Sequence, residues 1–345
     1  MQMDERKQKV LEAIIRDYVA TAEPVGSRTI ARKYSLGVSP ATIRNEMADL
    51  EEMGFIEQPH TSAGRIPSQR GYRYYVDCLM EKYNLHEEER AQISSSFARQ
   101  IREIDSILHE SGRLLSKLTN YTSIVTGPKS VQSSIQRIEF ITLRPGKVLL
   151  VMLTDAGVAV NKLLDVPEAV SLQDLQLLSR SFNARLKEIM LCGIKRTLLQ
   201  ELRRELMQQR QLLMVVLEIL DQYLQHGAEE KVYLGGILNI LSQPEFRNVE
   251  KIRRLLSVLE EDDKIRDLLG EDTERGIIIR IGDENKREEF QDCSIITATY
   301  EIEGQVGRLG LLGPTRMEYS KTVTLLDFVT RALSEAMKDY FGRKK

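Results

Sequence analysis

The first 76 residues contain three short helical patterns in close succession, and this restricts the chain to few folds. Apolar residues recur at steps of three and four over residues 6–18, and a shorter pattern follows Ser27, which is predicted to cap a second helix. Ser39-Pro40 predicts the start of a third helix, because a serine hydroxyl accepts hydrogen bonds from the first free amides and proline fits the first helical position. Gly54 is predicted to end this helix.

A turn-rich segment follows the third helix. Residues 55–58 alternate like a short strand, and Pro59 and Pro67 bracket nine residues in which Ile66 is the only large apolar side chain. Three helices followed by a small hairpin are typical of a winged helix-turn-helix. The sequence therefore predicts a DNA-binding domain of this type over residues 1–76.

Basic residues in this region are separated from acidic ones. The whole chain carries 49 basic and 51 acidic residues, a formal net charge of −2, which excludes a uniformly basic coat but not a local basic face. Two windows, residues 24–45 and 58–76, contain no acid and seven basic side chains, Arg28, Arg32, Lys33, Arg44, Arg65, Arg70 and Arg73. Phosphate neutralisation supplies most non-specific affinity for duplex DNA. A charge run alone is more often an ordinary solvated surface, and it is the accompanying predicted winged helix that favours DNA binding here.

The third helix carries the residues best suited to read bases. Ile43, Met47 and Leu50 follow helical spacing and are predicted to face the core, which turns Thr42 and Asn45 outward. Amide and hydroxyl groups bond base edges, and arginine binds guanine or phosphate; ordinary polar surface is the alternative. The predicted DNA-binding set, which includes the hairpin, is Arg28, Ser39, Thr42, Arg44, Asn45, His60, Thr61, Ser62 and Arg65.

The remaining chain reads as strands, then helices, then strands again. A long one-sided helix is predicted over residues 87–118. Strands are predicted over residues 135–143, 147–154, 157–164, 277–281, 295–300 and 306–312, and helices over 172–186, 198–224, 249–259 and 320–341. This order indicates an α+β multidomain chain, in which one α+β domain over residues 87–165 and 266–345 is interrupted by a mainly helical insertion over residues 166–265.

The sequence offers no positive sign of catalysis. The four histidines lack metal-ligand spacing, and glycines 304, 307, 310 and 313 fit no phosphate-binding pattern, so strand packing or turns are predicted for them. Asp283-Glu284 is interpreted as a polar turn. We expect no catalytic residue, no metal site and no cofactor, and we predict that the protein is not an enzyme.

The chain is expected in the cytoplasm. Its three cysteines are odd in number and widely spaced, as is typical of reduced thiols. The N-terminus is charged where a signal peptide needs an apolar stretch, and the longest apolar runs are far too short to span a membrane.

Six strings carry a resemblance to a known family. They are SPATIRNEMADL at 39–50, PHTSAGRIP at 59–67, GYRYYVD at 71–77, GDEN at 282–285, SIITATY at 294–300 and GPTRMEY at 313–319. With these strings the chain resembles the bacterial heat-inducible transcription repressors of the HrcA family over essentially its whole length. Ser68 stands where the family more often has threonine, and Asp283 where glutamate is common.

The resemblance implies more than the residue patterns do. It implies a homodimer whose winged helix is followed by a GAF-like domain with an inserted dimerisation domain, and which binds an inverted-repeat operator of the CIRCE type before chaperone operons. It also implies that the GroE chaperonin keeps the repressor active, and that heat stress lifts repression by diverting the chaperonin. The apolar string QLLMVVL at residues 211–217 suits either a subunit contact or burial within one subunit.

Two other functions remain open from the sequence. One is a ligand-controlled repressor, broadly similar to the IclR type, whose DNA affinity depends on a metabolite. The other is a protein-interaction factor whose winged helix binds a protein, which would lose little affinity between low and moderate salt.

Overall fold

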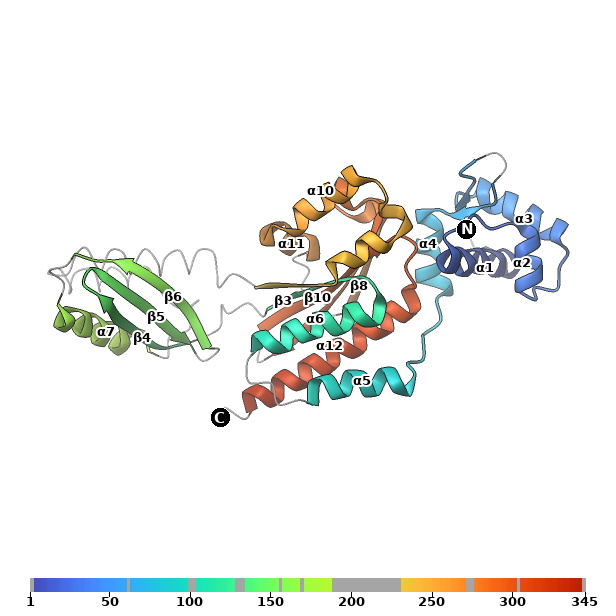
Figure 1. Cartoon of the computed structure of the whole chain (residues 1–345). Coiled ribbons are helices and arrows are strands. Elements are labelled where there is room, and N and C mark those ends of the chain that lie inside the picture. Colours follow the sequence, from blue (N-terminus) through green and yellow to red (C-terminus); the bar gives the residue numbers. More distant parts are fainter. Residues whose placement is uncertain are drawn as a thin grey trace. The chain divides into compact units, whose positions relative to one another are not determined.

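The computed structural model describes residues 3–60, 63–98, 104–127, 134–154, 157–167, 171–187, 231–270, 276–302 and 305–342 (Figure 1). The chain divides into two compact units. Unit 1 comprises Met1–Gly127, Lys231–Tyr300 and Gly307–Lys345, and unit 2 comprises Pro128–Glu230 and Glu301–Val306. Both units contain helices and strands, which confirms the predicted mixed α+β class.

Unit 1 begins with three helices that pack on one another. They are α1 (Glu5–Thr21), α2 (Ser27–Lys33) and α3 (Pro40–Glu52). Each helix contributes its apolar stripe to a shared core, and the three α3 residues predicted to face inward are among the buried ones. The core of this part comprises Val10, Leu11, Ile14, Ile15, Ile30, Ile43, Met47 and Leu50.

The starts of these helices follow their capping residues. Asp4 caps α1 and Ser39 caps α3, each by accepting a hydrogen bond from the backbone amide three residues further on. The predicted start of α2 is wrong by one residue. Ser27 is already helical, and Gly26 occupies the cap position without a side-chain hydrogen bond.

A two-stranded hairpin follows α3, as predicted. It pairs β1 (Ile56–Glu57) with β2 (Ile66–Pro67) in antiparallel register. Val25, which precedes α2, forms a further antiparallel bridge with Arg65. The helices and the hairpin are therefore tied together by backbone hydrogen bonds as well as by the core.

The chain leaves the hairpin through α4 (Gln69–Tyr74), which runs directly into a π-helical turn, η1 (Tyr75–Leu79). Neither element was expected from the sequence. Ser68 caps α4 by accepting from the Gly71 amide, and Tyr72 and Tyr75 are buried.

The larger part of unit 1 is built on a five-stranded sheet with the order β7-β3-β10-β9-β8. The chain runs antiparallel between β3 and each of its neighbours, β10 and β7, and between β8 and β9. The strands are β3 (Thr122–Thr126), β7 (Val232–Gly235), β8 (Ile277–Ile281), β9 (Cys293–Ile302) and β10 (Gln305–Pro314).

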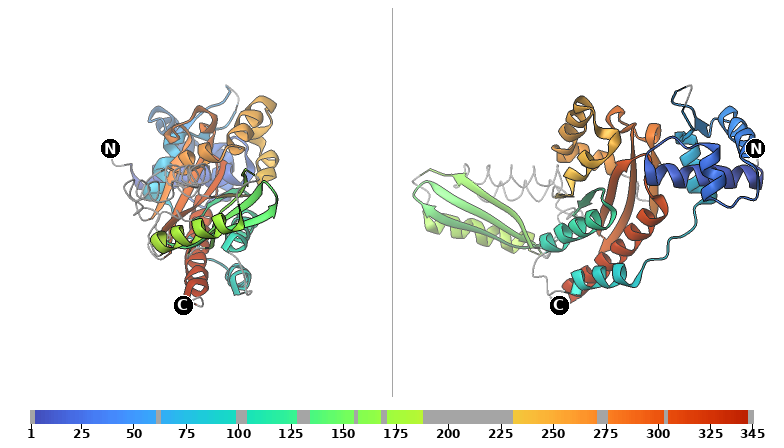
Figure 2. Two further views of the ribbon diagram at one scale, coloured as in Figure 1. Left: turned by 90° about the vertical axis from the view of Figure 1, so that its left-hand side faces the viewer. Right: turned by 45° about the vertical axis from the view of Figure 1, so that its right-hand side comes forward.

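Helices cover both faces of this sheet (Figure 1 and Figure 2). On one face lie α6 (Ile104–Thr119) and α12 (Tyr319–Gly342), with α5 (Glu87–Ala98) packed against α12. On the other lie α10 (Val249–Leu259) and α11 (Asp262–Leu269), together with two short 3-10 turns, η5 (Ile237–Ser242) and η6 (Pro244–Phe246). The single helix predicted over residues 87–118 is wrong, because its apolar stripe is divided between α5 and α6, which contact each other.

Glycine permits close packing on β10, as predicted for glycines 307, 310 and 313. A Cβ atom at Gly310 would lie 2.5 Å from a methyl carbon of Leu269, so α11 reaches the sheet only because this position has no side chain.

Unit 2 contains a separate three-stranded antiparallel sheet with the order β4-β5-β6, formed by the three strands predicted over residues 135–164. Its strands are β4 (Ile135–Arg144), β5 (Lys147–Thr154) and β6 (Gly157–Asp165), and α7 (Leu172–Leu186) packs on β4. The Asn183 side chain bonds both the amide and the carbonyl of Ile138, which fixes α7 on this strand. The predicted helix over residues 198–224 lies outside the described residues.

The boundaries of the insertion differ from the predicted ones. The sequence placed residues 135–165 in the interrupted domain and residues 231–265 in the insertion, whereas β4, β5 and β6 belong to unit 2 and β7, α10 and α11 belong to unit 1. The reason is that β7 pairs with β3, and this pairing joins segments more than a hundred residues apart. Short turns indicate that β4, β5 and β6 are neighbours in one sheet. They do not show whether that sheet is part of the central one or separate from it.

Candidate nucleic-acid interface

The outer face of α3 presents polar side chains on a rigid helix. Ser39 accepts a hydrogen bond from the Thr42 amide at 3.1 Å, and the two hydroxyl oxygens lie 3.0 Å apart. Arg44 and Asn45 are exposed and Thr42 is half-buried. The helix therefore displays an amide, a guanidinium and a hydroxyl near its capped N-terminus, where free backbone amides also favour an anion.

Two of the acidic residues of α3, Glu46 and Asp49, pair with Lys7 of α1. Glu46 is buried, and its carboxylate lies 2.9 Å from the Lys7 ammonium of α1, which also lies 3.0 Å from a carboxylate oxygen of Asp49. Hydrogen bonds with Glu46, then Asp49 and Asp4, raise the pKa of Lys7. These acids are neutralised within the domain, so they oppose an approaching phosphate less than their number suggests.

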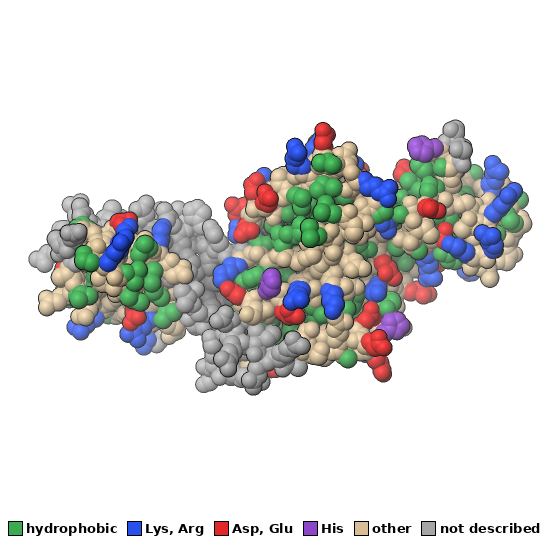
Figure 3. All heavy atoms as spheres, viewed as in Figure 1, with side chains coloured by type: hydrophobic (Ala, Val, Ile, Leu, Met, Phe, Trp, Pro, Cys, Tyr) green, Lys and Arg blue, Asp and Glu red, His purple; other side chains and the backbone are tan. Residues whose placement is uncertain are grey.

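Helix α2 adds two cations beside this face. Arg28 and Arg32 are both exposed, and in the described part of the chain neither they nor Arg44 has a carboxylate within ion-pair distance. Lys33 differs, because its ammonium lies 2.6 Å from the buried carboxylate of Asp17, and this hydrogen bond raises the pKa of Lys33. Figure 3 shows Lys and Arg side chains gathered on this N-terminal part of unit 1.

The hairpin carries the other predicted contacts. Arg65 does not extend from the tip: its Nε and Nη2 atoms lie 2.8 and 2.7 Å from a carboxylate oxygen of Glu51 at the end of α3, and its side chain is 21% exposed. His60 is exposed. Thr61 and Ser62 lie outside the described residues.

The last two cations of the windows have internal partners as well. The Arg70 guanidinium stacks 4.8 Å from the centre of the Phe55 ring and donates to the Met53 carbonyl at 3.0 Å. Arg73 pairs with Glu284 and Asp77. Of the seven basic residues, Arg28, Arg32 and Arg44 thus remain available to a ligand. Arg32 was not in the predicted contact set, although it lies in an acid-free window of the sequence.

Relatives of this chain are repressors. A family model described as the HrcA protein C-terminal domain matches residues 105–323. The heat-inducible transcription repressor HrcA of Pelotomaculum thermopropionicum is 48% identical over 340 residues, which is 98% of each chain. This chain belongs to the HrcA family. The HrcA repressor of Desulforamulus reducens is likewise 49% identical over 339 residues, again 98% of each chain.

A solved structure supports the fold over the full length of this HrcA family member. The crystal structure of a hypothetical protein at 2.2 Å resolution matches with a TM-score of 0.66 and covers 98% of this chain and 100% of that chain. At 24% identity this match shows a shared fold. Among the described residues, none of the helices has the length and apolar character needed to cross a bilayer, and no His, Cys, Asp or Glu cluster is arranged to bind a metal.

Proposed function

We propose that this protein is a sequence-specific DNA-binding repressor of heat-shock chaperone operons. The observation that carries the proposal is the outer face of α3, where Arg44 and Asn45 are exposed and Thr42 is half-buried, while Glu46 and Asp49 of the same helix pair with Lys7. On this proposal, α1 to α3 and the hairpin form a winged helix-turn-helix, and the five-stranded sheet with its helices is the GAF-like domain.

The arrangement suits a helix lying in a major groove. Asn45 can bond an adenine edge and Arg44 a guanine edge or a phosphate, while Ser39 and Thr42 meet the backbone at the helix start. Arg28 of α2 contacts phosphate. Such contacts neutralise the charge of the DNA phosphates, and they do not require breaking ion pairs among the described residues of the protein.

The hairpin lies beside the groove in this proposal. His60, Thr61 and Ser62, which lie between β1 and β2 in the sequence, contact the flanking backbone in this proposal. Arg65 contributes once a phosphate replaces Glu51 as its partner, since a DNA strand offers the same bidentate acceptor geometry as a carboxylate.

We further propose that the repressor acts in the cytoplasm as a homodimer on an inverted repeat of the CIRCE type. A two-fold dimer places one recognition helix in each of two half-sites, so the half-site separation follows from the protein. Unit 2 serves as the dimerisation domain. Repression is relieved on heat stress when the GroE chaperonin no longer supports the folded repressor. These features rest on the family to which the chain belongs.

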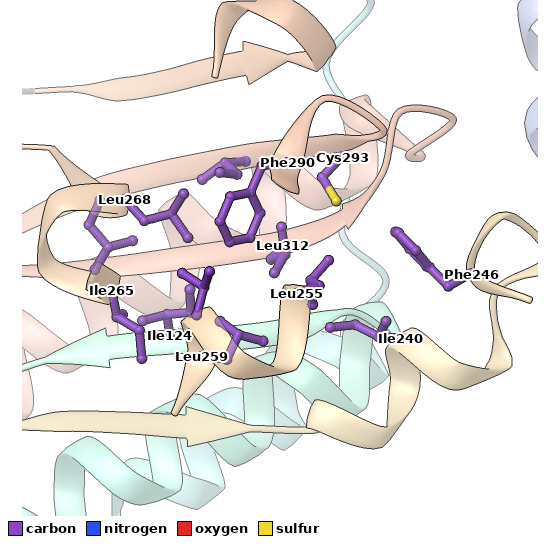
Figure 4. Packing of buried hydrophobic residues seen from close by; sticks show 13 residues of the cluster. Ile124, Ile240, Phe246, Leu255, Leu259, Ile265, Leu268, Phe290, Cys293 and Leu312 are labelled. Carbon is purple, nitrogen blue, oxygen red and sulfur yellow. The ribbon is translucent and has the colours of Figure 1, made fainter. Parts of the chain in front are cut away.

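On one face of the GAF-like sheet, the packing favours a structural core over a ligand site. A small-molecule site needs a cavity of about 300 Å³ or more. The space between the sheet and helices α10 and α11 is instead occupied by buried apolar side chains from both layers, among them Ile124, Leu259, Phe290 and Leu312 (Figure 4). A metabolite would have to displace this core.

A titration tests the proposed function. The full-length protein is mixed with a labelled duplex carrying the inverted repeat found upstream of a chaperone operon, and with a scrambled duplex of equal length, across a salt series. We expect tight binding to the repeat, weaker binding to the scrambled duplex, and a steep loss of both with salt. Equal affinity for the two duplexes, or an affinity that does not change with salt, would contradict the proposal.

A further inference from the structure

Helix α4 is held against the central sheet by an arginine. The Nε atom of Arg73 donates to Glu284 at 2.8 Å, and its Nη2 atom donates both to the second carboxylate oxygen and to the Ile279 carbonyl, the latter at 2.6 Å. Glu284 is itself oriented, because it accepts from the Ile281 amide at 2.8 Å. Arg73 and Glu284 thus form a bidentate pair in which the carboxylate is also oriented by the backbone.

The loop that carries Glu284 is shaped to receive α4. The buried Asn285 side chain donates to the carbonyls of Gly282, Phe290 and Cys293, each at 2.9 Å, and so fixes the loop from behind. Gly282 has φ of +55°, and a Cβ there would lie 2.2 Å from Gln69 of α4. The Gln69 side chain in turn accepts from the Asp283 amide at 2.8 Å. The polar turn predicted at 283–284 is thus a contact surface for α4.

A second arginine holds α1. Arg316, which follows β10, donates to the Val19 carbonyl in the last turn of α1 at 3.1 Å and pairs with Glu245 of η6. Its side chain is 13% exposed, so this pair is well shielded from solvent. Helix α1 has no basic residue in its own last turn, and Arg316 supplies the cation that the C-terminal end of a helix favours.

An apolar contact lies between these two polar ones. The rings of Tyr72 in α4 and Tyr319 in α12 are 5.9 Å apart, and both side chains are buried. Tyr319 is fixed by hydrogen bonds of 2.6 Å with the Ser294 hydroxyl and the Thr315 carbonyl. Three separate contacts therefore join α1 and α4 to the sheet, and together they restrict rotation as well as separation.

We propose that Arg73 and Arg316 are positioning residues for operator selection, which fix the orientation of the DNA-binding helices on the central domain. This inference rests on the proposed function. In a dimer, a rigid connection allows both recognition helices to enter the DNA only when the half-sites have one separation, whereas a loose connection accepts several. Neither arginine needs to touch DNA to have this effect.

The test measures spacer preference in the full-length protein. Dissociation constants are determined by fluorescence anisotropy for the inverted repeat with its own spacer, with a spacer longer by two base pairs, and for a single half-site. The variants are Arg73→Gln and Arg316→Gln. Arg331→Gln is the matched control, since Arg331 is exposed on α12 and pairs only along its own helix with Asp327 among the described residues.

We expect the wild type and the control to prefer the natural spacer by at least about tenfold, and each variant to lower this preference to about threefold or less. Binding to the single half-site should change by less than about twofold, because the reading face of α3 is intact. A variant that keeps the spacer preference of the wild type would overturn the inference, as would a wild type with none.

A measurement without DNA separates this inference from the proposed function. Hydrogen exchange of the 281–285 backbone, including the Asp283 amide that bonds Gln69, should be faster in Arg73→Gln than in the wild type or the control. Unchanged exchange shows that Arg73 does not hold α4, and overturns the inference. A wild type that does not distinguish operator from scrambled duplex makes the proposed function fail, and with it the role in operator selection, while the exchange still reports the contact.

Discussion

Helices α2 and α3 differ from α4 in what their arginines contact. Arg28, Arg32 and Arg44 project from α2 and α3 without an ion-pair partner in the described part of the chain, whereas Arg70 and Arg73 of α4 stack on Phe55 and pair with Glu284. The two sequence windows that carry these arginines, residues 24–45 and 58–76, are equally free of acids. What separates them is whether a carboxylate or a ring from elsewhere in the fold reaches the cation, so a basic window predicts DNA contact only where nothing else uses its charge.

The largest effect is expected when the residue proposed to bond a base edge is replaced. Asn45→Ala should reduce the preference for operator over scrambled duplex by about 1–3 kcal/mol, or roughly 5- to 150-fold, because an asparagine bonded to adenine discriminates by that amount. Binding to the scrambled duplex and the melting temperature should change little, since Asn45 is exposed. Asn161→Ala, at an exposed position of β6, is the control. An unchanged operator preference would exclude Asn45 as a base reader.

Arginines from the two regions should respond differently to salt. Arg28→Ala should weaken binding to every duplex and lower the slope of log affinity against log salt by about 0.9, the value for one lost phosphate contact. Arg70→Ala should leave that slope unchanged. It should instead lower the free energy of unfolding by about 1 kcal/mol, because the variant loses the stacking on Phe55 and the hydrogen bond to Met53. Equal slopes for both variants would remove the distinction between the regions.

A smaller effect is expected at Arg65, which is a proposed DNA contact but also has an internal partner. Glu51→Gln weakens the internal partner of Arg65 and removes a negative charge near the hairpin. We expect affinity for any duplex to rise by up to about fivefold at low salt, as suits a partly exposed pair worth about 0.2–1 kcal/mol. Glu250→Gln, which alters an exposed carboxylate on α10, is the control. If affinity does not rise, Arg65 stays bound to the body of the domain and the hairpin binds DNA without it.

The smallest effect concerns acid stability. Hydrogen bonds from the Lys7 amide and side chain lower the pKa of Asp4 in the folded protein. A depressed folded pKa stabilises the fold above the unfolded value of about 3.9, and this contribution is lost as the pH falls through the folded pKa. Unfolding midpoints measured from pH 5 to pH 2 should therefore fall less steeply for Asp4→Asn than for the wild type. Parallel curves would show that Asp4 is not protonated in this range.

The sequence was informative wherever the signal was local. The start of α3 at Ser39-Pro40 and the inward face of Ile43, Met47 and Leu50 were predicted correctly, because capping and helical spacing act over a few residues. The hairpin and β4 to β6 were predicted for the same reason. The membership of the chain in the HrcA family was also recognisable from its strings.

The largest errors concern features that depend on distant residues. Strands β3 and β7 are short, and their pairing partners lie far along the chain, so the insertion was placed wrongly. Arg73 and Glu284 are separated by 211 residues, and nothing near either of them indicates the other. The sequence therefore shows which residues of the candidate interface are cations. It does not show which of these cations lack an ion-pair partner once the chain has folded.

The pairing of β3 with β7 has a consequence for how this molecule varies. The chain leaves the sheet at Gly127 and returns at Lys231, and the amide of the first donates to the carbonyl of the second at 2.9 Å. Because these two ends are hydrogen-bonded neighbours, a short loop is enough to join them, while Glu301–Val306 at the junction of β9 and β10 is the other segment that belongs to unit 2. On the proposal that unit 2 forms the dimer, replacing residues 128–230 with a short loop should thus yield a folded monomer that binds one half-site. Such a protein would allow DNA recognition to be measured without dimerisation.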